Sequence, residues 1–150
     1  MAISAPGGNC VNTVTDSPCL YPILTTTNSG ETVPVSSTYT DSFNPTVGTS
    51  FSTPLVAGVA ALALSLHPKM TPQQVKQLLQ STARPFPPLG SIGSSVTAPE
   101  CTLPQYSLLG RPFDQLECYC TPTTCGAGML DAGAALAAAE SGAIAPLDGR

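Results

Sequence analysis

Residues 48–58 read Gly-Thr-Ser-Phe-Ser-Thr-Pro-Leu-Val-Ala-Gly, and this stretch decides how the chain folds. The residues that follow, through 55–66, are apolar or small on every side apart from Ser65. A helix that is apolar all round runs through a core rather than along a surface, so we predict a buried helix over about residues 49–66. Ser50 then lies in its first turn, where unpaired N–H groups and the positive end of the helix dipole can stabilise a negatively charged oxygen.

The same stretch resembles the nucleophile motif of the subtilisin-like serine proteases (subtilases, peptidase S8), G-T-S-x-[AS]-x-P-x-V-A-G. The resemblance implies that Ser50 is the catalytic nucleophile. The family usually has Met directly after the nucleophile, whereas this chain has Phe51, a change that alters the leaving-group side of the cleft but removes no catalytic group. The alternative is that Ser50 only caps an Ala/Leu-rich core helix.

Two further segments resemble the same family. Residues 125–132, Cys-Gly-Ala-Gly-Met-Leu-Asp-Ala, are similar to the segment that ends many subtilase domains, and we predict that Asp131 caps a closing helix over about residues 131–140. Residues 5–8, Ala-Pro-Gly-Gly, resemble the A-P-G turn that precedes the nucleophile in the family. The resemblance implies an α/β fold, the subtilisin-like three-layer fold with a mostly parallel sheet, present here as a partial, C-terminal piece.

Local signals predict the remaining elements. Residues 71–74, Thr-Pro-Gln-Gln, combine an N-cap, a proline at the first helical position and a capping-box glutamine. β-branched residues favour extended segments over 23–27 and 35–40, separated by a turn. The predicted apolar stripe of the helix after residue 71 is Val75, Leu78 and Leu79.

The chain has a single histidine, His67, and it cannot act as the base for Ser50. A serine nucleophile needs a base within hydrogen-bond reach and a group that orients the base. Seventeen residues of helix, at ~1.5 Å each, place His67 roughly 25 Å from Ser50. We predict instead that His67 is a cation or hydrogen-bonding group at a helix C-terminus, where Pro68 stops the helix.

No other segment of the chain supplies the rest of a subtilase triad, which requires an Asp motif and a His-Gly-x-His-like motif before the serine. Asp16 and Asp41 lie in Ser/Thr/Pro-rich loops and are predicted to form turns. Asn9 and Asn44 are the nearest candidates for the family's oxyanion asparagine, but both are predicted loop residues. We therefore assign residues 1–150 to the C-terminal portion of a subtilase catalytic domain and expect the Asp and His of the triad N-terminal to this chain.

The six cysteines favour an oxidising compartment and three disulfides. Cys10 and Cys19 bracket a short loop and are predicted partners. The other four allow three pairings, of which we favour the two between near neighbours, although the sequence leaves the choice open: Cys101 with Cys118, and Cys120 with Cys125. These bridges would pin the Pro/Gly/Ser-rich loop region over about 84–128. A zinc site on Cys118, Cys120 and Cys125 is the alternative, but the spacing is not the C-x2-C that zinc sites prefer.

The composition of the chain indicates which classes of partner to expect. Only 9% of the 150 residues are charged and the net charge is −4, with scattered Lys and Arg, so we expect no nucleic-acid partner. The apolar run over 55–66 is too short to span a bilayer, so we expect no membrane span. No metal or cofactor site is evident in this chain, although calcium is possible in a full-length enzyme. We expect a secreted or periplasmic protein whose signal peptide would lie upstream.

Two functional classes follow. The first is a serine endopeptidase that acts on protein or peptide substrates through Ser50, with the N-terminal half of the catalytic domain as a required partner, so that the chain alone is inactive. The second is a non-catalytic, disulfide-pinned secreted binding protein, or a truncated gene product, on the same scaffold. A subtilase Asp motif and His motif upstream of residue 1 would decide for the first.

Overall fold

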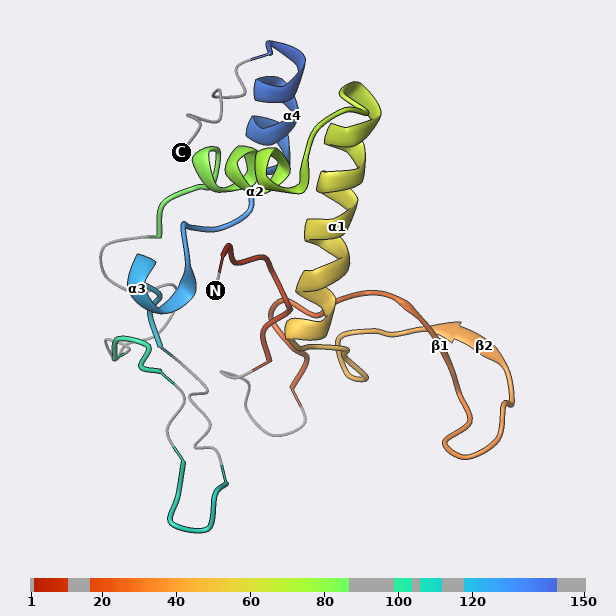
Figure 1. Cartoon of the computed structure of the whole chain (residues 1–150). Coiled ribbons are helices and arrows are strands. Elements are labelled where there is room, and N and C mark those ends of the chain that lie inside the picture. Colours follow the sequence, from red (N-terminus) through yellow and green to blue (C-terminus); the bar gives the residue numbers. More distant parts are fainter. Residues whose placement is uncertain (1, 11–16, 87–98, 104–105, 112–117, 143–150) are drawn as a thin grey trace. The chain divides into compact units, whose positions relative to one another are not determined.

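The computed structural model describes residues 2–10, 17–86, 99–103, 106–111 and 118–142 (Figure 1). Contacts divide the chain into two compact units, Pro6–Thr53 and Met1–Ala5 with Pro54–Arg150. The elements in chain order are β1 (Thr26–Asn28), β2 (Ser37–Tyr39), α1 (Thr49–Leu66), α2 (Pro72–Ser81), α3 (Pro122–Cys125) and α4 (Ala132–Glu140).

Helix α1 has the bounds that the sequence predicts, but the prediction that it is buried all round is wrong for this chain. Among its residues only Val59 and Ala63 are buried, whereas Leu55 and Leu62 are 44% and 51% exposed. The physical reason is that a helix buried on all sides needs neighbours on all sides. Within the described residues, the buried pair packs against α2 and α4 together with the half-buried Val56 and Ala60, and the opposite side of the helix, with Leu55 and Leu62, stays exposed.

By length and composition alone, α1 is long and apolar enough to cross a membrane, with a mean hydropathy of 1.5. The observed helix is longer than the run over 55–66 because it also takes in residues 49–54. The core helix of a soluble protein meets the same criterion, and Val59 and Ala63 of α1 contact protein side chains rather than an open surface. The absence of a membrane span stays a prediction.

Helices α2 and α4 form a small core with α1. The capping box of α2 is confirmed, because the Gln74 N–H donates to the Thr71 hydroxyl and the Gln74 side chain accepts from the Thr71 N–H. Leu78 and Leu79, from the predicted stripe of α2, are 2% and 5% exposed. Two clusters of buried side chains hold the helices together: Val59, Leu79 and Ala135 in one, and Ala63, Leu78 and Ala139 in the other.

The strands are fewer and shorter than a mostly parallel sheet requires. β1 and β2 pair antiparallel, with Thr27 opposite Thr38, and Asn28 closes the connection by accepting hydrogen bonds from the N–H groups of Gly30 and Val35. In the described part of the chain, parallel pairing is confined to isolated bridges such as Ser4 with Met129. Parallel neighbours need long crossover connections, so a piece of a domain retains few of them.

Three disulfides link the six cysteines, and they follow the pairing favoured from the sequence. The bridges are Cys10–Cys19, Cys101–Cys118 and Cys120–Cys125. The last two fall in the predicted loop region over 84–128, of which the structure describes residues 84–86, 99–103, 106–111 and 118–128. Because every one of these sulfurs is bound to another sulfur, Cys118, Cys120 and Cys125 hold no thiolate for a zinc ion in this state.

Candidate active site

Ser50 is the second residue of α1 and its side chain is exposed. Among the described residues its hydroxyl makes no hydrogen bond. Pro54 lies four residues further along the helix and has no N–H, so the Ser50 carbonyl also lacks its usual intrahelical partner. The first helical turn therefore presents a free hydroxyl beside backbone N–H groups that a helix leaves unpaired at its start.

The turn before Ser50 is held by close backbone contacts. The Gly48 N–H donates to the Gly7 carbonyl at 2.7 Å, and the Phe51 N–H donates to the Gly48 carbonyl at 3.0 Å. Gly48 has φ +145°, which favours glycine. A Cβ on Gly7 would lie 2.7 Å from the Gly48 oxygen and 3.1 Å from the Ser52 hydroxyl oxygen, so no side chain fits there. The Ala5-Pro6-Gly7 turn thus directly supports the turn that carries Ser50.

The sequence motifs predict residues 5–8 and 48–58 as separate segments and do not predict the contact between them. The available signal was the run of two glycines at Gly7 and Gly8 directly after a proline, which is typical of a site where another backbone comes close. In the structure both glycines face the nucleophile turn, since a Cβ on Gly8, at φ +84°, would overlap the Val47 side chain. Gly7 is the supporting residue that the structure adds to the site.

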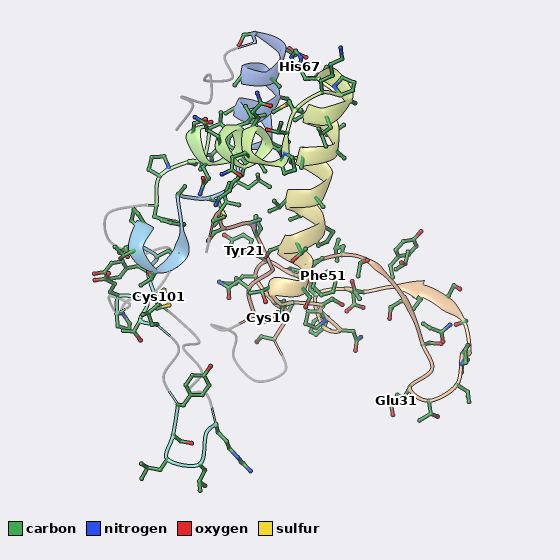
Figure 2. The ribbon with its side chains drawn as sticks, viewed as in Figure 1. Cys10, Tyr21, Glu31, Phe51, His67 and Cys101 are labelled. Atoms are coloured by element: carbon green, nitrogen blue, oxygen red, sulfur yellow. A yellow bond between two sulfur atoms is a disulfide. The ribbon has the colours of Figure 1, made fainter. Side chains whose placement is uncertain are left out.

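His67 has a structural partner, as the sequence predicts. It lies beyond the last turn of α1, while Phe51 lies in the first turn (Figure 2). Its Nε2 is 2.8 Å from the carbonyl oxygen of Ala139 in α4. Because a carbonyl only accepts, this contact requires the proton on Nε2. His67 therefore ties the end of α1 to the end of α4 and takes no part in the first turn of α1.

The aspartates considered for the triad and the asparagines considered for the oxyanion site also lie in loops. The Asp41 carboxylate accepts hydrogen bonds from the N–H groups of Asn44 at 2.6 Å and Phe43 at 2.8 Å, and these bonds hold its pKa below the usual range for an aspartate. Asn9 exchanges backbone hydrogen bonds with Tyr21 in an isolated antiparallel bridge. Asp41, Asn44 and Asn9 are thus loop residues, as predicted, and Asp16 lies outside the described residues.

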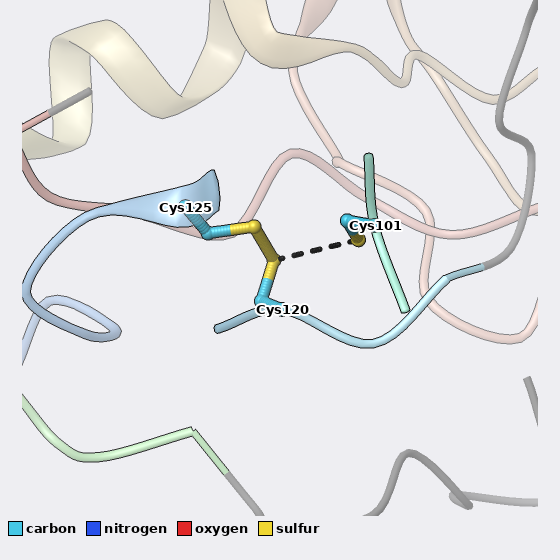
Figure 3. Close-up of side chains that lie close together, drawn as sticks. All are labelled: Cys101, Cys120 and Cys125. Atoms are coloured by element: carbon cyan, nitrogen blue, oxygen red, sulfur yellow. Dashed lines mark hydrogen bonds between the residues drawn. A yellow bond between two sulfur atoms is a disulfide. The ribbon is translucent and has the colours of Figure 1, made fainter. Parts of the chain in front are cut away.

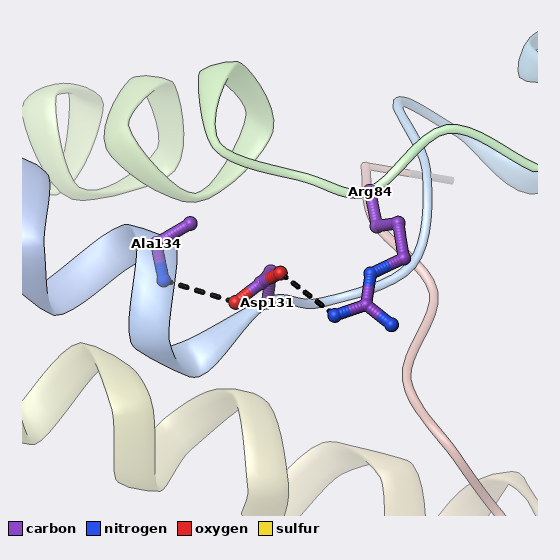
Figure 4. A network of polar contacts seen from close by, with 3 residues as sticks. All are labelled: Arg84, Asp131 and Ala134. Carbon is purple, nitrogen blue, oxygen red and sulfur yellow. Dashed lines mark hydrogen bonds and ion pairs between the residues drawn. The ribbon is translucent and has the colours of Figure 1, made fainter.

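The closing motif forms the cap that the sequence predicts. The Asp131 carboxylate accepts from the Ala134 N–H at 2.9 Å and from the Arg84 guanidinium at 3.0 Å (Figure 4). The Ala134 hydrogen bond first, and then Arg84, hold the pKa of Asp131 below its usual range. Met129 pairs with both Ser4 and Arg84, so this motif joins three separate segments of the chain.

Several known proteins resemble this chain over part or most of its length. The family model described as the Subtilase family matches residues 1–117. An extracellular protease of Xanthomonas campestris pv. campestris is 35% identical over 141 residues, which cover 93% of this chain and 16% of that protein. The subtilisin-like protease SBT3.13 of Arabidopsis thaliana is 51% identical over 43 residues, or 29% of this chain and 6% of that protein.

A solved structure agrees with this result. A protease from Pseudoalteromonas arctica superimposes with a TM-score of 0.57 at 30% sequence identity, covering 93% of this chain and 29% of that chain. The chain belongs to the subtilase family, and its fold is a partial piece of the subtilisin-like α/β fold. It spans less than a third of the length of each of these relatives.

Proposed function

We propose that this chain supplies the nucleophile, Ser50, of a subtilase-type serine endopeptidase. The observation that carries the proposal is the exposed, unbonded Ser50 hydroxyl in the first turn of α1, within a stretch that matches the family's nucleophile motif. The membership of the chain in the subtilase family supports the same role. The match includes Gly48, which has a positive φ in the turn before Ser50, and Pro54, which has no N–H to pair with the Ser50 carbonyl.

The chemistry follows from this position. The Ser50 oxygen attacks a peptide carbonyl, and a histidine takes the hydroxyl proton and later donates it to the leaving amine. The carbonyl oxygen becomes an oxyanion, which the backbone N–H of Ser50 helps to hold at the helix N-terminus. The histidine that acts as the base and the aspartate that orients it are expected in sequence N-terminal to this chain, because His67 is hydrogen-bonded to the Ala139 carbonyl at the far end of α1.

We also propose a substrate, a partner and a location for this reaction. The substrate is a protein or peptide, and the N-terminal half of the catalytic domain is the partner that completes the site. The similarity to an extracellular protease and the three disulfides support a secreted or periplasmic location. We propose no nucleic-acid partner and no membrane span for this chain. We propose calcium as a ligand of the full-length enzyme only.

A fluorophosphonate probe tests the assignment, because it reacts only with an activated serine. In the full-length protein, with its N-terminal half present, we expect one adduct, on Ser50. Ser52 is the internal control, since it lies two residues further along the same helix and is not the aligned nucleophile. An adduct mapped to Ser52 contradicts the assignment of Ser50. No adduct in a correctly folded protein with an intact upstream triad also contradicts it and favours the non-catalytic scaffold.

A further inference from the structure

Two disulfides in the loop region lie against each other. The sulfur of Cys101, which is bonded to Cys118, is 4.0 Å from the sulfur of Cys120, which is bonded to Cys125 (Figure 3). The sulfurs of Cys101, Cys120 and Cys125 all lie within 4.8 Å of one another. Disulfides exchange by attack of a thiolate on a bridging sulfur, so this contact places a potential attacking sulfur next to an existing bridge.

The backbone sets Cys101 opposite Cys120. Glu100 and Tyr119 pair in a parallel bridge, and the Cys101 N–H donates to the Tyr119 carbonyl at 2.9 Å. One residue further along each segment stand Cys101 and Cys120. Adjacent strands lie about 4.8 Å apart, inside the range of roughly 4.4–6.8 Å that a disulfide spans between Cα atoms. The usual spacing of paired strands is therefore compatible with a Cys101–Cys120 bridge.

Each of the two bridges has at least one half-buried sulfur. Cys101, Cys118 and Cys120 are all half-buried, whereas Cys125 is 8% exposed. Of these four, Cys118 lies outside the close group of three sulfurs. A soluble thiol reductant that attacks the Cys118 sulfur forms a mixed disulfide with it, and the electron pair of the broken bond leaves on Cys101, which becomes a thiolate beside Cys120.

We propose that the four cysteines form one exchangeable unit, in which a freed Cys101 thiolate attacks the Cys120 sulfur. The Cys101–Cys120 bond forms, the Cys120–Cys125 bond breaks, and its electron pair leaves on the Cys125 sulfur, which then takes a proton from water. The exchange itself changes no oxidation state. The three sulfurs lie within 4.8 Å of one another, so the freed Cys101 sulfur stays beside the Cys120–Cys125 bond that it attacks.

The exchange acts on the part of the loop that touches the N-terminal segment. Cys125 is the last residue of α3, and its carbonyl accepts a hydrogen bond from the Ser4 hydroxyl at 2.9 Å. The Ala127 N–H donates to the Ala2 carbonyl at 3.2 Å. Release of Cys125 removes the covalent link that holds this turn, so the redox state of the Cys101–Cys118 bridge reaches the contact between residues 2–4 and 125–127.

A pair of single substitutions in the full-length protein tests the proposal, because both remove the same bridge and free different sulfurs. Cys118→Ser frees Cys101, and Cys101→Ser frees Cys118, which is not a member of the close group of three sulfurs. Free thiols are blocked with N-ethylmaleimide, and peptic peptides prepared at low pH locate the label. We expect most of the label on Cys125, with a Cys101–Cys120 linkage, in Cys118→Ser, and the label on Cys118 in Cys101→Ser.

Partial reduction of the unsubstituted protein gives a second measurement that does not depend on how the variants fold. After brief treatment with a limiting phosphine reductant, blocking and mapping, we expect a singly reduced species that contains Cys101–Cys120 and carries label on Cys118 and Cys125. The proposal is overturned if the label in Cys118→Ser stays on Cys101 with Cys120–Cys125 intact. It is equally overturned if the singly reduced protein contains no Cys101–Cys120 linkage.

Discussion

The helical region and the region that ends at the nucleophile are built in different ways. In Pro54–Arg150, the described apolar core lies where three helices meet, and it consists of Val59, Ala63, Leu78, Leu79, Ala135 and Ala139. In Pro6–Thr53, the one buried side chain among those described is Thr40, which is polar. The proposed nucleophile thus belongs to the region with no described apolar core of its own.

Hydrogen bonds and a disulfide hold this second region instead. The Thr40 hydroxyl donates to the Ile23 carbonyl at 2.9 Å and accepts from the Thr25 N–H at 2.9 Å, and the Cys10–Cys19 bridge closes a nearby loop. Exposed apolar side chains that gather in one region mark a surface that packs against something else. This region exposes Leu20, Tyr21, Leu24, Val33, Val35, Tyr39, Phe43 and Val47, and the helical region exposes Leu55, Leu62, Leu66, Leu103, Tyr106, Leu108 and Leu109. Both regions thus leave apolar side chains uncovered, and this supports our proposal that an N-terminal half completes the site.

The largest expected effect concerns activity without that half. We expect the 150-residue chain to hydrolyse a peptide substrate no faster than its Ser50→Ala variant, because its single histidine, His67, is held against Ala139 beyond the far end of α1. Loss of triad members in serine proteases costs roughly 10⁴–10⁶-fold in rate. Turnover is measured for both proteins under the same conditions. Hydrolysis by the chain that disappears in Ser50→Ala would show that the region ending at the nucleophile is self-sufficient.

Substitution of two leucines measures the difference in packing. Leu78→Ala removes a side chain that is 2% exposed and should lower the free energy of unfolding by about 2–5 kcal/mol. Leu62→Ala is the matched control, since Leu62 is 51% exposed in this chain and its loss should cost about 0.5 kcal/mol or less. Urea unfolding of the chain gives both values.

The same control sharpens the comparison in the full-length protein. If an N-terminal half covers the open side of α1, the cost of Leu62→Ala should rise toward that of Leu78→Ala. A cost for Leu62→Ala that is equal to that of Leu78→Ala in the chain alone would contradict the difference in packing. A cost that stays small in the full-length protein would leave α1 without the expected cover.

Gly7→Ala tests whether the support of the nucleophile turn matters for reactivity. A methyl group there would lie 2.7 Å from the Gly48 oxygen, so the turn must shift. Misplacement of a reacting group by about 1 Å can cost on the order of 10²-fold in rate, and we expect a loss of that order in fluorophosphonate labelling of Ser50. Gly133→Ala is the control, because its new methyl would make an ordinary 3.6 Å contact. Unchanged labelling in Gly7→Ala would remove Gly7 from the site.

The helices could be predicted because their signals are local in the sequence. The contacts between distant segments could not be predicted. The caps at Thr71 and Asp131 act within one turn, so the sequence alone fixes where α2 and α4 begin. The Gly7–Gly48 contact joins segments far apart in the chain, and no pattern within either segment specifies the other. The exposure of α1 was missed for a related reason. An apolar pattern shows that a helix seeks a partner, but not whether that partner is in the chain.

The candidate site also contains some features that the local sequence predicts and others that depend on packing between distant segments. The motif around Ser50 could be matched from its residues, and the structural role of His67 followed from its place after the helix. The acceptor of His67, Ala139, could not be foreseen because it depends on how α4 packs beside α1. The identity of Ser50 as the nucleophile remains a prediction that the labelling experiment tests.

The smallest expected effect lies at the start of α4, in the helical region that has its own core. Asp131 accepts a hydrogen bond from Ala134 and pairs with Arg84, and both contacts lower its pKa. A lowered folded-state pKa means that the charged form stabilises the fold above about pH 4. This stabilisation is lost as the pH falls through the folded-state pKa.

Two substitutions separate the cap from the ion pair. We expect Asp131→Ala to lower the melting temperature at pH 7 more than Arg84→Met does, since the Arg84 side chain is 73% exposed and its ion pair is weakened by water. The difference between the native protein and Asp131→Ala should shrink in acid, because protonation then removes the charge from Asp131. Thermal unfolding across pH 2–7 gives both comparisons. A difference that persists unchanged below the lowered pKa would show that the carboxylate charge contributes nothing to the cap.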